Sequence, residues 1–130
     1  IINSRLEKKG NDVFVTFGEK TALKLPAEKA NDPALQDYIG KEIIAGVRPE
    51  ALYDEQEYIT RYADSTIEAF VEVTELMGAE IYQYIICEEQ PFIARVAAQS
   101  VARAGDTIKV AINPSKIHIF DKDTERCIVH

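Results

Sequence analysis

The most chemically distinctive segment is Gly46-Val47-Arg48-Pro49-Glu50, where an apolar run ends in an arginine and a glutamate on either side of a proline. Proline has no amide hydrogen to donate to a β-ladder, so Pro49 is predicted to stop a strand. Arg48 and Glu50 can then hold the following turn through charge-assisted hydrogen bonds. We expect the Arg48 guanidinium to be partly buried, so that its removal costs roughly 1–3 kcal/mol. In a second interpretation these residues shape the junction, or seam, between the two β halves of the domain and thereby the surface that the domain offers to a second copy.

Few other residues have the types and spacing needed for chemistry. His118 alternates with apolar neighbours, and a lone strand histidine is more often structural than a ligand. Asp121 and Asp123 lie two residues apart, but the segment lacks the glycine and distal glutamate of a calcium loop, so a hairpin turn is the better interpretation. The sequence has no glycine-rich phosphate loop and no H-E-x-x-H pair. We therefore predict no catalytic, cofactor-binding or metal-ligating residues.

Composition narrows the function classes further. The chain has 130 residues, 46% hydrophobic and 28% charged, and a net charge of −7, which fits one compact domain. The acidity argues against nucleic acid and anionic membranes as partners, because both attract basic surfaces. No apolar run reaches the roughly 18 residues that span a bilayer. Cys87 and Cys127 are expected to be reduced thiols, as in a cytoplasmic protein.

Alternating apolar residues and turn signals predict strands through most of the chain. The first half contains three short strands, over 5–9, 13–17 and 21–25, and a further strand before Pro49. One short helix is expected between them, with Asp32 as N-cap, Pro33 at the first helical position and Gly40 as the stop.

The second half follows the polar, tyrosine-rich segment ALYDEQEYITRYADS, which is expected to form a short helical turn and a surface excursion. Its expected strands are STIEAFVEVTELMG, EIYQYIICEE, PFIARVA, DTIKVAI and KIHIFD. In the first of these, alternation places Ile67, Ala69, Val71 and Val73 on one face. The chain is therefore predicted to be mainly β, a barrel or sandwich of two packed halves, about 1–50 and 65–130, within a single domain 1–130.

Four motifs in this order resemble the C-terminal regulatory region of MalK-type ABC importer ATPases, the OB-like fold called TOBE. The motifs are Val47-Arg48-Pro49-Glu50, Leu76-Met77-Gly78-Ala79-Glu80, Gly105-Asp106 and Ile117-His118-Ile119-Phe120-Asp121. The resemblance runs over nearly the whole chain. It implies a regulatory and dimer-stabilising domain of the ATP-binding subunit of an importer, expected to carry sugars.

The resemblance also implies which residues and partners matter. A structural or regulatory seam, meaning the junction between the two β halves, is expected to consist of Arg48, Pro49, Glu50, Gly78, Glu80, His118 and Phe120. Tyr53 and Tyr58, together with exposed apolar residues of the second half, are expected to form an interface with another chain. The partners are a second copy, paired weakly, the ATPase domain and through it the membrane permease subunits, and a regulatory protein. The complex would lie at the cytoplasmic face of the membrane.

The catalytic parts of such a subunit are expected to precede Ile1, in a longer chain from which this domain is excised. The chain alone is then no enzyme and has no cofactor, since ATP and Mg²⁺ belong to the missing ATPase domain. Two other functions are weighed against this one. A small-ligand or oxyanion-binding domain of the molybdate-binding type would share the OB-like build but needs a cluster of anion donors. An oligonucleotide-binding OB module is disfavoured by the acidity.

Overall fold

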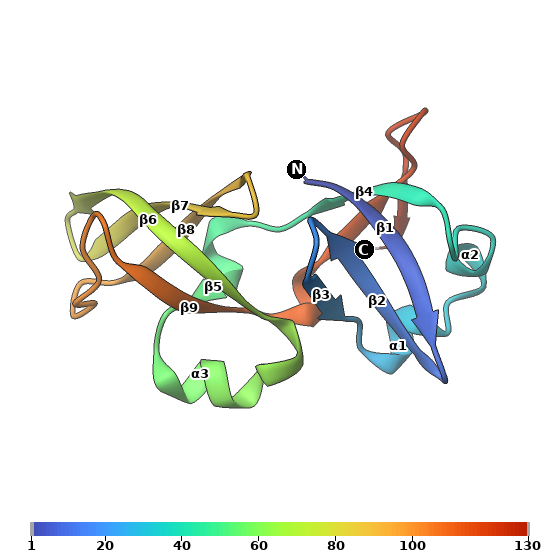
Figure 1. The fold of residues 1–130 in the computed structure, drawn as a ribbon, viewed down its shortest axis with the longest axis horizontal. Coiled ribbons are helices and arrows are strands. Elements are labelled where there is room, and N and C mark those ends of the chain that lie inside the picture. The colour runs from blue at the N-terminus through green and yellow to red at the C-terminus, as the bar shows by residue number, and fades with distance from the viewer. Residues whose placement is uncertain (1, 130) are drawn as a thin grey trace. The chain divides into compact units, whose positions relative to one another are not determined.

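The computed structural model describes residues 2–129, so the two ends of the predicted domain, residues 1 and 130, lie outside it. The chain forms two compact units, residues 1–47 with 114–130 (unit 1) and residues 48–113 (unit 2). Both are built on antiparallel sheets with short helices, which confirms the mainly β prediction (Figure 1). Each unit is described by itself below.

Unit 1 contains a six-stranded sheet in the order β11-β10-β4-β1-β2-β3. Its strands are β1 Ile2–Lys9, β2 Asp12–Phe17, β3 Thr21–Lys24, β4 Glu42–Gly46, β10 His118–Phe120 and β11 Cys127–Val129. Its helices are α1 Ala27–Ala30, α2 Pro33–Gln36 and the 3₁₀ turn η3 Pro114–Lys116. Alternate side chains of the strands, such as Leu6, Val15 and Ile119, are fully buried and form its core.

The predicted helix start is confirmed at Asp32, whose side chain accepts a hydrogen bond of 2.9 Å from the Ala34 amide. The helix itself is only one turn long. The prediction of one helix before β4 was wrong, because α1 precedes it. A helix as short as α1 lacks a long apolar period, so the sequence pattern does not reveal it. The short helical turn expected in the tyrosine-rich segment is confirmed by α3.

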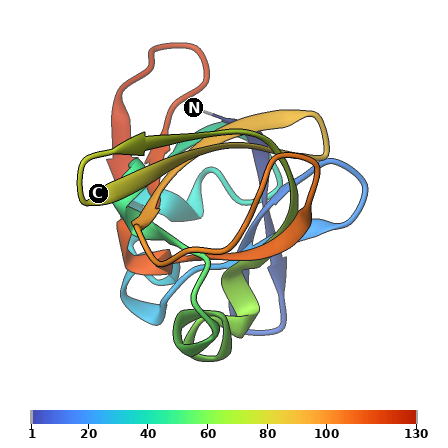
Figure 2. The same ribbon diagram turned by 90° about the vertical axis from the view of Figure 1, so that its left-hand side faces the viewer.

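Unit 2 contains a five-stranded sheet in the order β5-β9-β6-β7-β8. Its strands are β5 Leu52–Tyr53, β6 Thr66–Met77, β7 Glu80–Cys87, β8 Gln90–Ala97 and β9 Thr107–Ile112. Its helical segments are α3 Gln56–Arg61 and the 3₁₀ turns η1 Pro49–Ala51 and η2 Ala63–Ser65. The strands curve round so that β8 also contacts β5, which nearly closes the sheet into a barrel (Figure 2).

The topology groups the chain differently from the two successive halves expected from the sequence. His118–Phe120 pairs with β4, and Cys127–Val129 pairs in turn with β10, so the last strands complete the first sheet. Sequence order alone suggests neighbours among consecutive strands, and here the C-terminal segment returns to an element more than seventy residues earlier.

A β-bulge in β6 changes which residues face the core. Val71 pairs with Ile85 and Val73 with Tyr84, so Glu72 is the extra residue. Ile67, Ala69 and Val71 are buried as predicted, but Val73 is 50% exposed. The predicted common face was therefore wrong at Val73, because the extra residue reverses the alternation.

Candidate functional site

The Arg48-Pro49-Glu50 segment follows β4, which ends at Gly46, and forms a 3₁₀ turn. Arg48 is extended at the N-cap, and its carbonyl oxygen accepts a hydrogen bond of 3.0 Å from the Ala51 amide. Pro49 takes the first helical position, where a missing amide hydrogen costs nothing. Both charged side chains are exposed, so the expected partial burial of Arg48 was wrong. The role of the segment as a seam stays a prediction.

Arg95 on β8 pairs with one of the predicted residues, Glu80. Its Nε lies 3.1 Å from the Glu80 Oε2 at the start of β7. A hydrogen bond with Tyr82 and the negative charges of Glu80 and Glu50 raise the pKa of the Arg95 guanidinium above its ordinary value. Sequence reasoning missed Arg95, although it is the one charged residue among the alternating apolar residues of its strand.

Gly78 belongs to the tight turn that joins β6 to β7. The pairing of Met77 with Glu80 leaves a loop of Gly78 and Ala79 alone. Gly78 has φ +68°, the left-handed region that the first residue of a type II′ hairpin turn requires. Gly78 therefore allows the tight hairpin turn to form, and this turn places Glu80 beside Arg95.

His118 and Phe120 lie in unit 1, in β10, opposite Gly46 and Ile44 of β4. Phe120 packs against Gly46 so closely that a Cβ atom at residue 46 would lie 3.1 Å from the Phe120 Cε2. His118 is half-buried. The predicted seam residues thus fall in two groups, one on this strand pair and one in unit 2, rather than in one cluster.

Tyr53 and Tyr58, the predicted interface residues, stack on each other with ring centroids 4.0 Å apart and planes 16° apart. Tyr62 extends the stack, 6.3 Å from Tyr58, and the Arg61 guanidinium lies 4.9 Å from the Tyr58 centroid. Burial raises the pKa of Tyr53. The helical spacing of Tyr58 and Tyr62 is the signal that could have identified this larger cluster.

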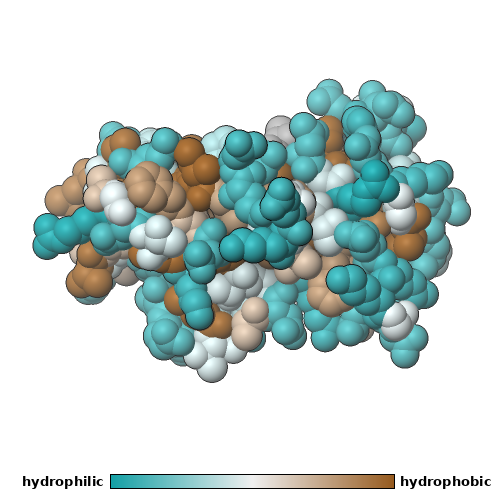
Figure 3. All heavy atoms as spheres, viewed as in Figure 1, coloured by the Kyte–Doolittle hydropathy of each residue, from teal (hydrophilic) through white to brown (hydrophobic). Residues whose placement is uncertain are grey.

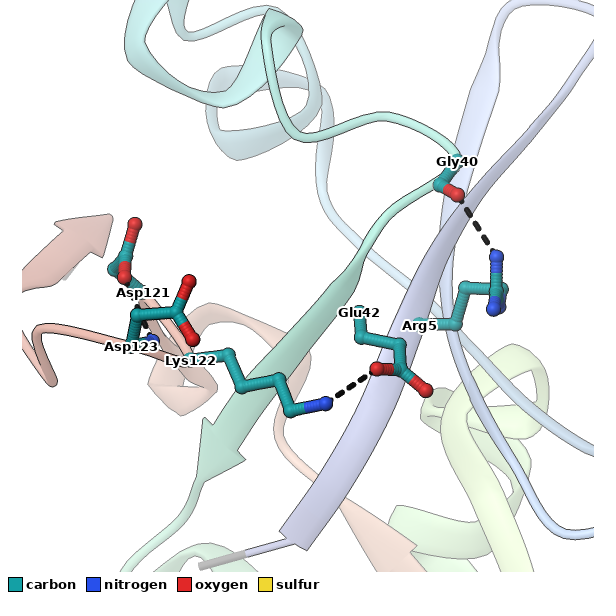
Figure 4. A network of polar contacts seen from close by, with 6 residues as sticks. All are labelled: Arg5, Gly40, Glu42, Asp121, Lys122 and Asp123. Atoms are coloured by element: carbon teal, nitrogen blue, oxygen red, sulfur yellow. Dashed lines mark hydrogen bonds and ion pairs between the residues drawn. The ribbon is translucent and has the colours of Figure 1, made fainter.

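Polar contacts connect the loop between β10 and β11 in unit 1 to β4 (Figure 4). Lys122 donates a hydrogen bond to Glu42 of β4. Asp121 accepts hydrogen bonds from the amides of residues 123 and 124, and one of 2.6 Å from the Tyr38 hydroxyl. These bonds, that of Tyr38 first, lower the pKa of Asp121 to about 2. The interpretation of this segment as a hairpin loop is confirmed.

Unit 2 has a pocket of about 790 Å³ next to a buried polar cluster. Gln83, fully buried on β7, donates hydrogen bonds to Asp54 Oδ2 and Ser100 Oγ, and Ser100 also bonds Asp54. The pocket carries the carboxylates of Asp54, Glu55 and Asp106. This surrounding suits a structural polar cluster better than a site for an anion.

The outer face of β6, β7 and β8 exposes large apolar side chains. Phe70 is 46% exposed, Val73 50% and Ile93 42%. Tyr82 and Tyr84, two residues apart on β7, share this outer face. In Figure 3 hydrophobic side chains lie among polar ones on the surface over β6 and β7.

Two absences hold for residues 2–129. No group of three or more histidine, cysteine, aspartate or glutamate side chains is arranged to hold a metal ion. In the same part of the chain no helix is long and apolar enough to cross a membrane. Cys87 and Cys127 are thiols rather than halves of a disulfide.

Comparisons with known proteins connect these features to a family. The MalK OB fold domain model matches residues 1–52 and the TOBE domain model residues 45–120. The chain is 41% identical over 114 residues to the oligosaccharides import ATP-binding protein MsmX of Bacillus subtilis, covering 88% of this chain and 31% of that protein. It is 35% identical over 118 residues to the trehalose/maltose import ATP-binding protein MalK of Thermococcus litoralis, covering 90% and 32%.

A solved structure is similar in fold. It is the cytoplasmic molybdate-binding protein ModG with molybdate bound, with a TM-score of 0.60 over 90% of this chain and 89% of that one, at 19% identity. At that identity the similarity shows the fold alone. The chain spans about a third of the length of the curated relatives named above. The family-model matches show that the chain belongs to the family of MalK OB fold and TOBE domains.

Proposed function

We propose that this chain is the regulatory, dimer-stabilising domain of the ATP-binding subunit of a sugar ABC importer. The observation that carries the proposal is the breadth of the match: relatives named as import ATP-binding proteins match 88% and 90% of this chain, but only about a third of their own length. The remaining two thirds of those proteins leave room for the nucleotide-binding machinery. The sequence of this chain has no phosphate loop of its own.

In this proposal the chain is not an enzyme and holds no cofactor, since ATP and Mg²⁺ bind in the ATPase region. Its partners are that region, the membrane permease subunits that it contacts, a second copy and a regulatory protein. The complex lies at the cytoplasmic face of the membrane. The predicted seam residues act as structural supports; they are Arg48, Pro49, Glu50, Gly78, Glu80, His118 and Phe120. The cluster of Tyr53 and Tyr58 is a candidate contact with another chain.

A chimera tests the importer assignment. The segment of MsmX that matches this chain would be replaced by residues 1–130 and expressed in Bacillus subtilis lacking MsmX. We expect growth on the oligosaccharides that MsmX imports to be restored. The control is the same protein with the segment deleted. A chimera that accumulates and hydrolyses ATP but restores no growth would count against this function.

Two measurements on the isolated chain complete the test. Calorimetric titration with Mg-ATP is expected to give no saturable binding, and micromolar binding would contradict the assignment of ATP to another region. Sedimentation equilibrium is expected to show mostly monomer at low micromolar concentration, because the ATPase regions supply much of the contact in the full subunit. A nanomolar dimer would mean that this domain drives assembly by itself.

The alternative of an oxyanion-binding domain receives less support. The ModG fold is shared, but the pocket of unit 2 carries three carboxylates and a single lysine, Lys109. An anion there would meet like charges. Titration with molybdate, with sulfate as the matched control anion, would reverse this preference if either bound saturably.

A further inference from the structure

The two units differ sharply in charge. Of the 22 acidic and 15 basic residues of the chain, 12 and 5 lie in unit 2, whereas unit 1 has 10 of each. The entire net charge of −7 therefore belongs to unit 2. Positive charge on a partner protein would therefore favour its binding to unit 2 by electrostatic attraction.

The same unit exposes an apolar area on the outer side of β6, β7 and β8. We call this area the outer face; it consists of Phe70, Val73 and Met77 on β6, Tyr82, Tyr84 and Ile86 on β7, and Ile93 on β8. The strand register places them in adjacent rows: Phe70 lies beside Ile86, and Val73 beside Tyr84, which lies beside Ile93. Neighbouring cross-strand residues touch, so the part of the outer face formed by Phe70, Ile86, Val73, Tyr84 and Ile93 is contiguous.

Acidic residues lie around this face, and one of them, Glu75, lies within it between Val73 and Met77. They are Glu68, Glu72 and Glu75 on β6, Glu80 on β7, and Glu88 and Glu89 in the turn between β7 and β8. Against these six stand two basic residues on the same outer side, Arg95 and Lys109. Arg95 already pairs with Glu80, and Lys109 lies opposite Glu68 in the sheet. The rim therefore keeps an excess of carboxylates.

We propose that the outer face is the docking surface for an amphipathic helix of another protein, one whose apolar stripe is flanked by lysine and arginine. Contiguous apolar surface rimmed by charge is typical of protein contact sites. A second copy of this chain is a poor occupant, because it would bring its own acidic rim against this one. The proposal is independent of the importer assignment, since it rests on the surface of unit 2 alone.

The dimensions of the face fit a helix lying along the strands. β7 and β8 each contain 8 residues, or about 26 Å at 3.3 Å per residue. A helix of about 18 residues has that length, and its diameter of about 10 Å matches the width of three strands. An added strand is less suitable, because the free side of β8 is already in contact with β5 and η1.

The test uses the full chain and a synthetic 18-residue helical peptide with leucine at helical spacing and lysine on both flanks. The matched peptide has glutamate in place of every lysine. We expect saturable binding of the lysine peptide alone, weakened as salt rises because the rim charges are screened. Amide shifts in NMR spectra should concentrate on β6, β7 and β8.

Two pairs of variants locate the binding. Phe70→Glu on the outer face should weaken binding at least about tenfold, and Val101→Glu, equally acidic but off the face and 86% exposed, should leave it unchanged. Glu72→Lys should weaken it as well, whereas Glu55→Lys, with the same change of charge on another surface, should have a smaller effect. Because Glu72 is exposed at a bulge, its variant keeps the test valid if Phe70→Glu does not fold.

Three results would overturn the proposal. The first is no binding of the lysine peptide up to millimolar concentration. The second is equal binding of the two peptides, or equal weakening by Phe70→Glu and Val101→Glu, which would indicate attraction to the acidic unit as a whole. The third is a dimer of the unmodified chain that Phe70→Glu converts to monomer in sedimentation, because a second copy would then cover the face.

Discussion

The Nζ atom of Lys29 donates a hydrogen bond of 2.7 Å to the main-chain carbonyl oxygen of Ile117, 88 residues away in the sequence. Lys29 is only 5% exposed although it lies in the one-turn helix α1. Its ammonium group therefore ties the first helix of unit 1 to the segment that leads into β10. A buried lysine with one acceptor is unusual, because burial disfavours its charged form.

Burial lowers the pKa of Lys29 below its ordinary 10.5, and this sets a pH dependence. Between the lowered pKa and 10.5 the unfolded chain binds more protons than the folded one, so the free energy of unfolding rises with pH over that range. In the Lys29→Met variant the free energy of unfolding should not rise with pH over this range. Chemical denaturation of both proteins at several alkaline pH values measures the difference, and two parallel curves would contradict the expectation.

Tyr38 controls the acidity of Asp121. Their 2.6 Å hydrogen bond is the largest of the contributions that lower the pKa of Asp121 to about 2. In Tyr38→Phe we expect that pKa to move towards the ordinary 3.8, and the stability lost as pH falls from about 4 to 2 to become smaller. NMR titration of the Asp121 carboxyl measures its pKa in the unmodified chain and in the Tyr38→Phe variant. An unchanged pKa in the variant would mean that the backbone amides alone hold the carboxylate.

A larger residue in place of Gly46 should destabilise the protein while Phe120 is present. Gly46→Ala places a methyl group 3.1 Å from the Phe120 Cε2, which is tighter than most Cβ contacts, so the ring must shift by a few tenths of an ångström. We expect a loss of about 1–3 kcal/mol in the free energy of unfolding. The same substitution in a Phe120→Leu background is the control and should cost less. Equal costs in both backgrounds would show that the ring is not the obstacle.

Substitutions in the turn between β7 and β8 are expected to stabilise the protein. Cys87 pairs with Gln90, so Glu88 and Glu89 form a two-residue loop, with φ of +46° and +70°. Positive φ at both positions is the type I′ turn, which favours asparagine followed by glycine. The double substitution Glu88→Asn with Glu89→Gly should stabilise the protein by about 1 kcal/mol. The control is Glu88→Gln with Glu89→Gln, which removes the same two charges but keeps a side chain at both positions, and thermal unfolding compares the two variants.

Local chemistry sufficed to predict many elements of this protein. Alternation located the strands, and Asp32 marked a helix start, because each of these signals depends only on neighbouring residues. The motifs around Arg48, Gly78 and Phe120 were sufficient to recognise the family that the comparisons show.

Other features depend on residues that are distant in the sequence. The return of β10 to β4, the ion pair of Glu80 with Arg95 and the burial of Lys29 each require partners that no local pattern specifies. The exposure of Val73 follows from one extra residue in β6, which is visible only in the pairing with β7. Strand pairing also assigns residues 114–130, with equal numbers of acidic and basic residues, to unit 1. The concentration of negative charge around the outer face of unit 2 was therefore decided by the tertiary structure, because the sequence determines the total charge but the fold determines which surface carries it.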